Sequence, residues 1–96
     1  MKKRILIVDD EPSIVRLLSL RLRAKNYEVF VAYDGLECVK VALKEIPDLI
    51  LLDIKMPNED GIAAFKRLIQ MEKTKGIPVI FMTAYPKLEL KKQVLD

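Results

Sequence analysis

Two short apolar runs that each end at aspartate constrain the fold of this 96-residue chain more than any other feature. Residues 5–8 are followed by Asp9 and Asp10, and residues 49–52 are followed by Asp53. Continuous apolar runs of this length are typical of strands that are covered on both faces. If both runs are parallel strands, their carboxylates meet at one edge of a sheet and repel one another unless a hard cation lies among the oxygens. The sequence therefore predicts a Mg²⁺ site, with one carboxylate available as a nucleophile.

The rest of the chain repeats the same alternation of an apolar run and an amphipathic segment. The predicted strands cover residues 4–8, 28–32, 48–53 and 78–83, and the predicted helices cover residues 10–25, 36–46, 61–72 and 86–95. Strict alternation implies a parallel sheet with right-handed crossovers. In such sheets ligands bind beyond the carboxyl ends of the strands, where the strand order reverses. For the flavodoxin-like order 2-1-3-4-5 that point lies between the first and third strands, which are the strands that end at the aspartates.

The spacing of apolar residues predicts which helix faces are buried. The predicted inward residues are Ile14, Leu17, Leu18 and Leu22 in the first helix, Val39, Ala42, Leu43 and Ile46 in the second, and Ala64, Phe65, Leu68 and Ile69 in the third. These positions recur every three or four residues, as expected for a helix that covers one face of a sheet.

Composition excludes several classes of function. The chain has no histidine, and its three glycines form neither a Walker loop nor a dinucleotide fingerprint, so any phosphate handled here comes from outside rather than from bound ATP. The 17 basic residues are dispersed, which indicates solvated faces and a partner surface rather than direct nucleic-acid binding. The single cysteine excludes an internal disulfide and favours a reducing cytoplasm. We expect neither a signal peptide nor a membrane span.

Four segments together resemble the receiver domain of two-component response regulators. They are ILIVDDE at residues 5–11, LLDIKMP at 51–57, DG at 60–61 and PVIFMTA at 78–84, in the order and spacing of that family. The resemblance extends over essentially the whole chain. It implies an α/β fold, a flavodoxin-like doubly wound parallel sheet, and a signalling module rather than an enzyme that turns over a metabolite.

The resemblance also implies a role for individual residues. Asp53 would be the phosphoacceptor, phosphorylated by a histidine kinase or a histidine phosphotransfer protein. Asp10 and Asp53 would bind Mg²⁺ directly, Asp9 would act through a water, and the backbone carbonyl of Lys55 would complete the protein ligands. Thr83 would be the switch hydroxyl, which turns toward the phosphoryl group when the domain is activated.

The pattern departs from the family at the carboxyl end of the chain. A receiver has five β-α units, and four are visible, so we expect residues 1–96 to form the first four units with strand order 2-1-3-4. The fifth strand, its lysine and the last helix have no counterpart here. The outer edge of residues 79–82 would then lack a neighbouring strand. Two copies could pair or exchange elements at that edge, the monomer could be looser, or the sequence could be part of a longer protein.

Two alternatives to a phosphorylated switch follow from the residues. The truncated fold could instead act as a self-associating or partner-binding module that does not switch. A phosphohydrolase with an aspartyl nucleophile is disfavoured, because such enzymes place a second aspartate two residues after the nucleophile. That position is Lys55, and no histidine can replace the missing acid.

Overall fold

Four parallel strands form one sheet in the order β2-β1-β3-β4. The strands are β1 (Arg4–Val8), β2 (Glu28–Ala32), β3 (Leu49–Asp53) and β4 (Val79–Met82). The computed structural model describes residues 2–82, apart from the side chain at position 59. Thr83 and the predicted helix at residues 86–95 lie outside the described residues. The flavodoxin-like order 2-1-3-4 is confirmed for the part of the chain that is described.

The strand register explains why the first apolar run is so continuous. β1 lies between β2 and β3, and its residues 6–8 are fully buried. Val8, the last residue of β1, pairs with Leu52, which immediately precedes Asp53. The register therefore brings the residues that follow β1 next to the end of β3.

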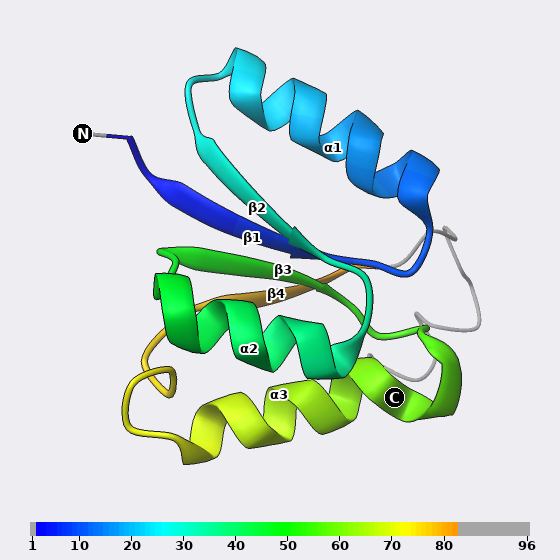
Figure 1. Ribbon diagram of the computed structural model, residues 1–96, viewed down its shortest axis with the longest axis vertical. Helices are drawn as coiled ribbons and strands as arrows, with labels where there is room; N and C mark the ends of the chain where they lie inside the picture. Colours follow the sequence, from blue (N-terminus) through cyan, green and yellow to red (C-terminus); the bar gives the residue numbers. More distant parts are fainter. Residues whose placement is uncertain (1, 83–96) are drawn as a thin grey trace, which may run out of the picture.

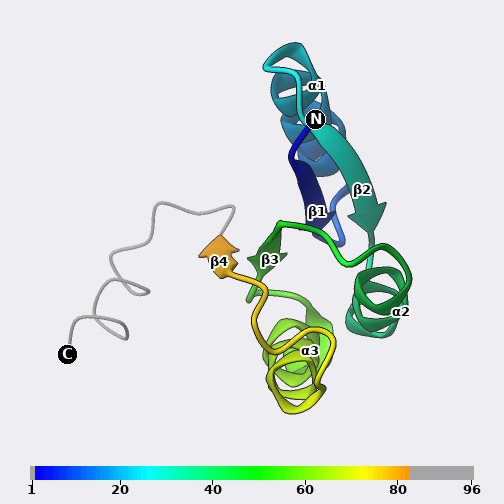
Figure 2. The same ribbon diagram turned by 90° about the vertical axis from the view of Figure 1, so that its left-hand side faces the viewer.

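Three helices cover the two faces of the sheet (Figures 1 and 2). The helix α1 (Pro12–Ala24) lies on one face, while α2 (Gly35–Glu45) and α3 (Asp60–Gln70) lie side by side on the other. Pro12 occupies the first turn of α1, where its missing N–H costs nothing. Asp34 caps α2 by accepting a 2.8 Å hydrogen bond from the Glu37 amide. Residues 57–59 form a 3₁₀ turn, η1 (Pro57–Glu59), before α3.

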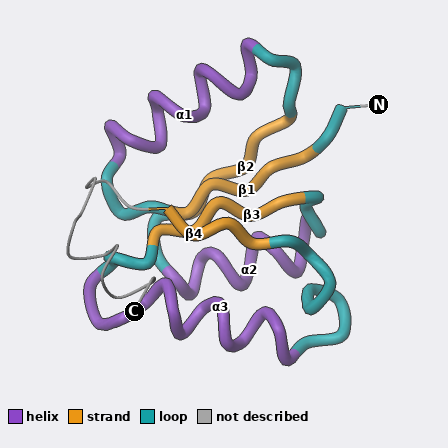
Figure 3. The backbone as a smooth tube through the Cα atoms, turned by 180° about the vertical axis from the view of Figure 1, so that it is seen from behind, coloured by secondary structure: helices purple, strands orange, loops and turns teal. Residues whose placement is uncertain are grey.

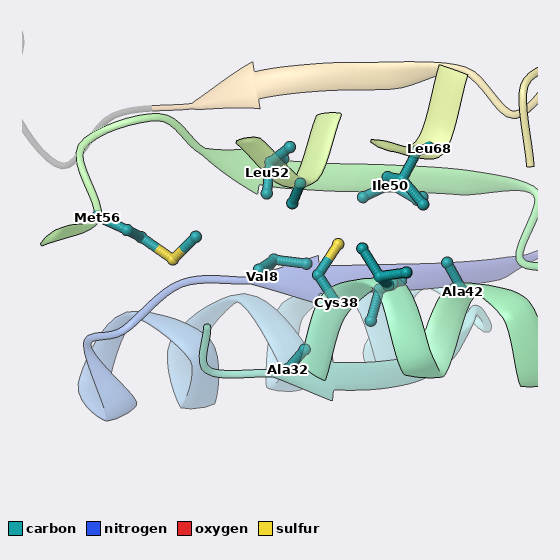
Figure 4. Close-up of a cluster of buried hydrophobic side chains, with 11 residues drawn as sticks. Val8, Ala32, Cys38, Ala42, Ile50, Leu52, Met56 and Leu68 are labelled. Carbon is teal, nitrogen blue, oxygen red and sulfur yellow. The ribbon is translucent and has the colours of Figure 1, made fainter. Parts of the chain in front are cut away.

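The larger core cluster fills the space between the sheet and the helices α2 and α3 (Figure 4). Leu52 and Ile50 of β3 face Ala64 and Leu68 of α3 in this cluster, and Cys38 of α2 is fully buried in it. A smaller cluster lies under α1, and Val15 is the buried apolar residue that this helix contributes to it. Within the described residues, 2–82, no helix combines the length and the apolar character needed to pass through a bilayer.

The predicted helix faces are only partly correct. Leu17, Leu43, Ile46 and Ile69 were predicted to be inward, but between 37% and 49% of their surface is exposed. The buried residues of α2 and α3 include Val39, Ala42, Ala64 and Leu68, as predicted, whereas the buried residues of α1 are Val15 and Ser19. A helix that packs closely on a sheet buries a narrow stripe of small residues, so larger apolar side chains lie on its flanks.

The carboxyl end of α3 is secured by the turn that leads to β4. The Thr74 hydroxyl donates a 2.7 Å hydrogen bond to the Leu68 carbonyl, and the Thr74 side chain is almost completely buried. This bond satisfies one of the carbonyls that a helix leaves without a partner at its end.

Candidate functional site

Three carboxylates gather where the strands end. Figure 3 shows that this edge of the sheet lies beside the start of α1. Asp9 directly follows β1, and Asp53 is the last residue of the neighbouring β3. The Asp9 amide donates a 3.2 Å hydrogen bond to the Ala32 carbonyl, which extends the pairing with β2 by one residue. One carboxylate oxygen from each of Asp9, Asp10 and Asp53 lies within 4.8 Å of the other two. The predicted convergence of these three residues is confirmed.

Local hydrogen bonds fix the orientation of the two buried carboxylates. Oδ1 of Asp9 accepts a 2.9 Å bond from the Glu11 amide, and Oδ1 of Asp53 accepts a 2.8 Å bond from the Lys55 amide. Each bond joins an aspartate to the residue two positions later, which is the usual way in which this side chain organises a turn. The sequence therefore sets the direction of each carboxylate through the loop that immediately follows it.

The electrostatics of the site are unfavourable in the absence of a cation. The pKa of Asp9 is raised to about 6, mainly by burial, which the hydrogen bond from the Glu11 amide opposes, and also by the negative charges of Asp53 and Asp10. Asp9 and Asp53 are buried, whereas Asp10 is exposed. Within residues 2–82, none of the ion pairs involves any of these three aspartates. Like charges kept this close indicate a site that is completed by a positive ion.

The donor set fits Mg²⁺. The three residues offer only carboxylate oxygens, which are hard ligands, and no sulfur or imidazole is among them. Mg²⁺ typically binds one or two carboxylates and keeps several waters, and one exposed carboxylate beside two buried ones leaves an open side for those waters.

Two other predicted site residues are less fully described. Lys55 begins the loop after Asp53, with its amide bonded to Asp53 and its side chain exposed. The role of its carbonyl as a metal ligand stays a prediction. Thr83 lies outside the described residues, although β4 ends at Met82, which pairs with Asp53.

Sequence reasoning missed a contact between the starts of α2 and α3. Oδ2 of Asp60 accepts a 2.6 Å hydrogen bond from the Gly35 amide. Both helices begin at an Asp-Gly pair, at residues 34–35 and 60–61, and this repetition is the signal that could have indicated it. In the first pair, Asp34 caps α2 and Gly35 is its first residue.

Comparison with known proteins agrees with the fold and the site. The family model described as "Response regulator receiver domain" matches residues 5–96. Sporulation initiation phosphotransferase F of Bacillus subtilis is 42% identical over 90 residues, which cover 94% of this chain and 71% of that protein. The DNA-binding dual master transcriptional regulator RpaA of Synechocystis is 41% identical over 93 residues. That match covers 97% of this chain but only 39% of the length of RpaA.

Solved structures show the same architecture. Chemotaxis protein CheY4 of Vibrio cholerae superposes with a TM-score of 0.84 at 31% identity, over 97% of this chain and 78% of CheY4. The receiver domain of the sensor histidine kinase PA1611 from Pseudomonas aeruginosa superposes with a TM-score of 0.85 at 29% identity, over 97% of this chain and 75% of that one. The PA1611 structure holds a magnesium ion coordinated in its active-site cleft. On its sequence, its strand order and its acidic site, this chain belongs to the response regulator receiver domain family.

Proposed function

We propose that this chain is a phosphoacceptor module of a two-component phosphorelay, in which Asp53 takes a phosphoryl group from a phosphohistidine on a partner protein. The observation that carries this proposal is the buried Asp53 carboxylate at the end of β3, with its Oδ1 fixed by the Lys55 amide and two further carboxylates beside it. A carboxylate that is oriented in this way can attack phosphorus in line.

The transfer needs no further reactant except a proton from the solvent. An oxygen of Asp53 forms a bond to phosphorus while the bond from phosphorus to the imidazole nitrogen of the partner breaks. The electron pair of that bond stays on the imidazole, which then takes up a proton. The product is an aspartyl phosphate on this chain and an unmodified histidine on the partner.

Asp10 and Asp53 would hold Mg²⁺ directly, with Asp9 acting through a water and the carbonyl of Lys55 as a further ligand. When bound there, the ion neutralises charge on the phosphoryl oxygens and on the three carboxylates. Asp9, with its raised pKa, binds a proton more readily than an ordinary aspartate, so acidification competes with the metal. Thr83, which follows β4, would bond to the phosphoryl group as the switch hydroxyl.

The outer face of α1 is the surface that we propose for the phosphodonor partner. Leu17 and Leu20 are 49% and 61% exposed there, and Arg16, Arg21 and Arg23 are exposed on the same helix. The helix begins at Pro12, two residues after Asp10, so a partner bound to it would lie beside the acidic site. Exposed leucines next to arginines suit a partner helix with an apolar stripe and acidic flanks.

Intact mass spectrometry tests the phosphoacceptor proposal. The protein is incubated with Mg²⁺ and acetyl phosphate, beside Asp53→Asn as the control. We expect the wild type to gain the mass of one phosphoryl group, and we expect no gain in Asp53→Asn or in the presence of a chelator. A folded wild-type protein that gains no mass would refute the proposal.

The docking surface is tested separately with Leu20→Glu. We expect this variant to be phosphorylated by acetyl phosphate at the wild-type rate, but more slowly by a histidine phosphotransfer protein that phosphorylates the wild type. Equal rates with the protein donor would show that the partner binds elsewhere.

Self-association through β4 is a second candidate function. Among the residues described, the outer edge of β4 pairs with no strand, and Ile80 and Phe81 are 53% and 44% exposed. We expect sedimentation velocity to detect a dimer that Ile80→Lys weakens. A protein that remains monomeric up to high concentration would remove this candidate.

A further inference from the structure

Resting on the proposed metal site, we propose that Asp60 is a positioning residue for Mg²⁺ binding. Its carboxylate fixes the start of α3 to the start of α2, and α3 in turn fixes the backbone at Asp53. Asp60 itself is not among the clustered carboxylates. It would act through Gly61 and the loop at residues 54–59.

Asp60 contacts Gly35 at the start of α2. The Gly35 amide donates a 2.6 Å hydrogen bond to Oδ2 of Asp60, across 25 residues of sequence. A Cβ atom at Gly35 would lie 2.6 Å from the Asp60 carbonyl oxygen and 2.7 Å from its Oδ1, closer than such atoms approach in proteins. Only glycine at position 35 lets the two helices meet in this way.

The first turn of α3 contacts the phosphoacceptor backbone. A Cβ atom at Gly61 would overlap the carbonyl oxygen of Asp53 and lie 3.2 Å from the Cα atom of Ile54. The first turn of α3 therefore rests directly against the end of β3. A shift of that turn cannot occur without moving the backbone of Asp53 or opening a gap beside it.

This backbone and the loop that follows it carry the expected ligands. Asp53 supplies a carboxylate, and its Oδ1 is bonded to the amide of Lys55, the residue whose carbonyl is the other expected ligand of this loop. The loop is short, and Met56 anchors its middle because its side chain is 96% buried in the core (Figure 4). Asp53 and Lys55 therefore move together with the first turn of α3. Mg²⁺ demands accurate placement of its ligands, so a looser loop lowers affinity.

The charge of Asp60 offers a competing explanation, which substitutions can separate. Asp60→Asn removes the charge but keeps an oxygen that accepts the Gly35 hydrogen bond. Asp60→Ala removes both. A positioning role predicts that the asparagine variant behaves as the wild type, whereas long-range attraction of Mg²⁺ predicts that both variants are equally impaired.

Isothermal titration of the protein with Mg²⁺ measures the effect without any phosphoryl transfer. We expect Asp60→Ala to bind Mg²⁺ about tenfold more weakly, as is usual when support beyond the ligands is lost. Asp60→Asn should stay within about twofold of the wild type, because its amide oxygen replaces the carboxylate as acceptor. The amide proton of Gly35, observed by NMR, should shift upfield in Asp60→Ala and keep its position in Asp60→Asn.

Thr74→Val is the matched control for a merely structural effect. It removes a buried hydrogen bond at the other end of α3, between the Thr74 hydroxyl and the Leu68 carbonyl. We expect it to lower the unfolding midpoint to a similar extent while leaving the Mg²⁺ affinity unchanged.

The outcomes separate this inference from the proposed function. Three results would each overturn the positioning role alone. Asp60→Ala could bind Mg²⁺ with wild-type affinity, or both Asp60 variants could lose the same Mg²⁺ affinity. The third is that Thr74→Val loses as much Mg²⁺ affinity as Asp60→Ala. A wild-type protein that binds no Mg²⁺ would overturn the metal site and this inference together. Failure of the phosphoacceptor proposal would instead appear as wild-type protein that binds Mg²⁺ but takes up no phosphoryl group.

Discussion

At the edge of the sheet where the strands begin, Arg4 contacts three acidic residues. At the edge where the strands end, three acidic residues lie next to one another. The Arg4 guanidinium pairs with Glu45 at 2.9 Å and with Glu28 at 3.5 Å, and the Arg4 amide donates a 2.8 Å bond to Asp48. The carboxylates of Asp9, Asp10 and Asp53 form no ion pair within residues 2–82.

The two edges therefore contribute differently to the molecule. Arg4 connects β1 to β2 through Glu28 and to α2 through Glu45, and its guanidinium lies 4.9 Å from the centre of the Phe30 ring. Its charge is satisfied within the fold. The opposite edge carries an excess of negative charge that a ligand has to complete, and such sites are typical of function rather than of stability.

The largest expected effect is the pH dependence caused by Asp9. Its pKa is about 6 in the folded protein and 3.8 by the reference value for an exposed group, so the folded state binds its proton more tightly. The proton on Asp9 therefore raises the free energy of unfolding by up to about 3 kcal/mol below pH 4, and this stabilisation is lost as the pH rises through 6. Urea unfolding of the metal-free wild type and of Asp9→Asn, at pH 4 and pH 7, measures it.

We expect Asp9→Asn to become the more stable protein, relative to the wild type, as the pH increases. Saturating Mg²⁺ at pH 7 should stabilise the wild type and reduce this difference, because the ion compensates the charge that the proton would otherwise remove. If the free energies of unfolding of the two proteins changed with pH in parallel, the pKa of Asp9 would not be raised in the folded protein.

The next largest effect is expected at the opposite edge, from Arg4→Met. This substitution keeps an apolar stem over Phe30 but leaves Glu45 and the Glu45 carbonyl without their guanidinium partner. Because the Arg4 side chain is one-third exposed, we expect a loss of about 1–2 kcal/mol in the free energy of unfolding. The Mg²⁺ affinity should not change.

Lys75→Met is the control for this comparison. It breaks the 2.9 Å pair between Lys75 and Glu72, whose side chains are 54% and 84% exposed. Exposed pairs contribute little, so the expected change is below about 0.5 kcal/mol. An equally small effect of Arg4→Met would mean that the network at that edge is not stabilising.

The smallest effect is expected from Ile46, which follows Glu45 at the end of α2. Ile46 has a left-handed backbone conformation, with φ 44° and ψ 67°, and its side chain is 41% exposed. A β-branched residue is strained there, whereas asparagine is tolerated, so Ile46→Asn should raise the free energy of unfolding by about 0.5–1 kcal/mol. Ile69→Asn, at a similarly exposed helical position, should not stabilise, and a gain in both variants would point to a cause other than backbone strain.

The sheet and the acidic site could be predicted from the sequence because both depend on local patterns. A buried parallel strand is a continuous apolar run, and parallel strands end at a common edge, so Asp9, Asp10 and Asp53 could be brought together without coordinates. The strand bounds agree with the prediction to within one residue in the described part of the chain.

The helix faces and the support of the site could not be predicted in the same way. Leu17 and Leu43 are as apolar as any core residue, and only the distance between helix and sheet decides that smaller residues lie inward. The bond between Asp60 and Gly35 depends on how α2 and α3 lie beside each other, which the repeated Asp-Gly pair alone does not determine.

Cys38 gives the protein an internal reporter of core opening. Its thiol is completely buried, and burial together with the charges of Asp60 and Asp34 raises the pKa of Cys38 to about 12. A buried thiol that stays protonated does not react with alkylating reagents, so modification requires that α2 separate from the sheet. The rate at which this single cysteine is labelled therefore measures, in the unaltered chain, how often the layer that supports the acidic site comes apart.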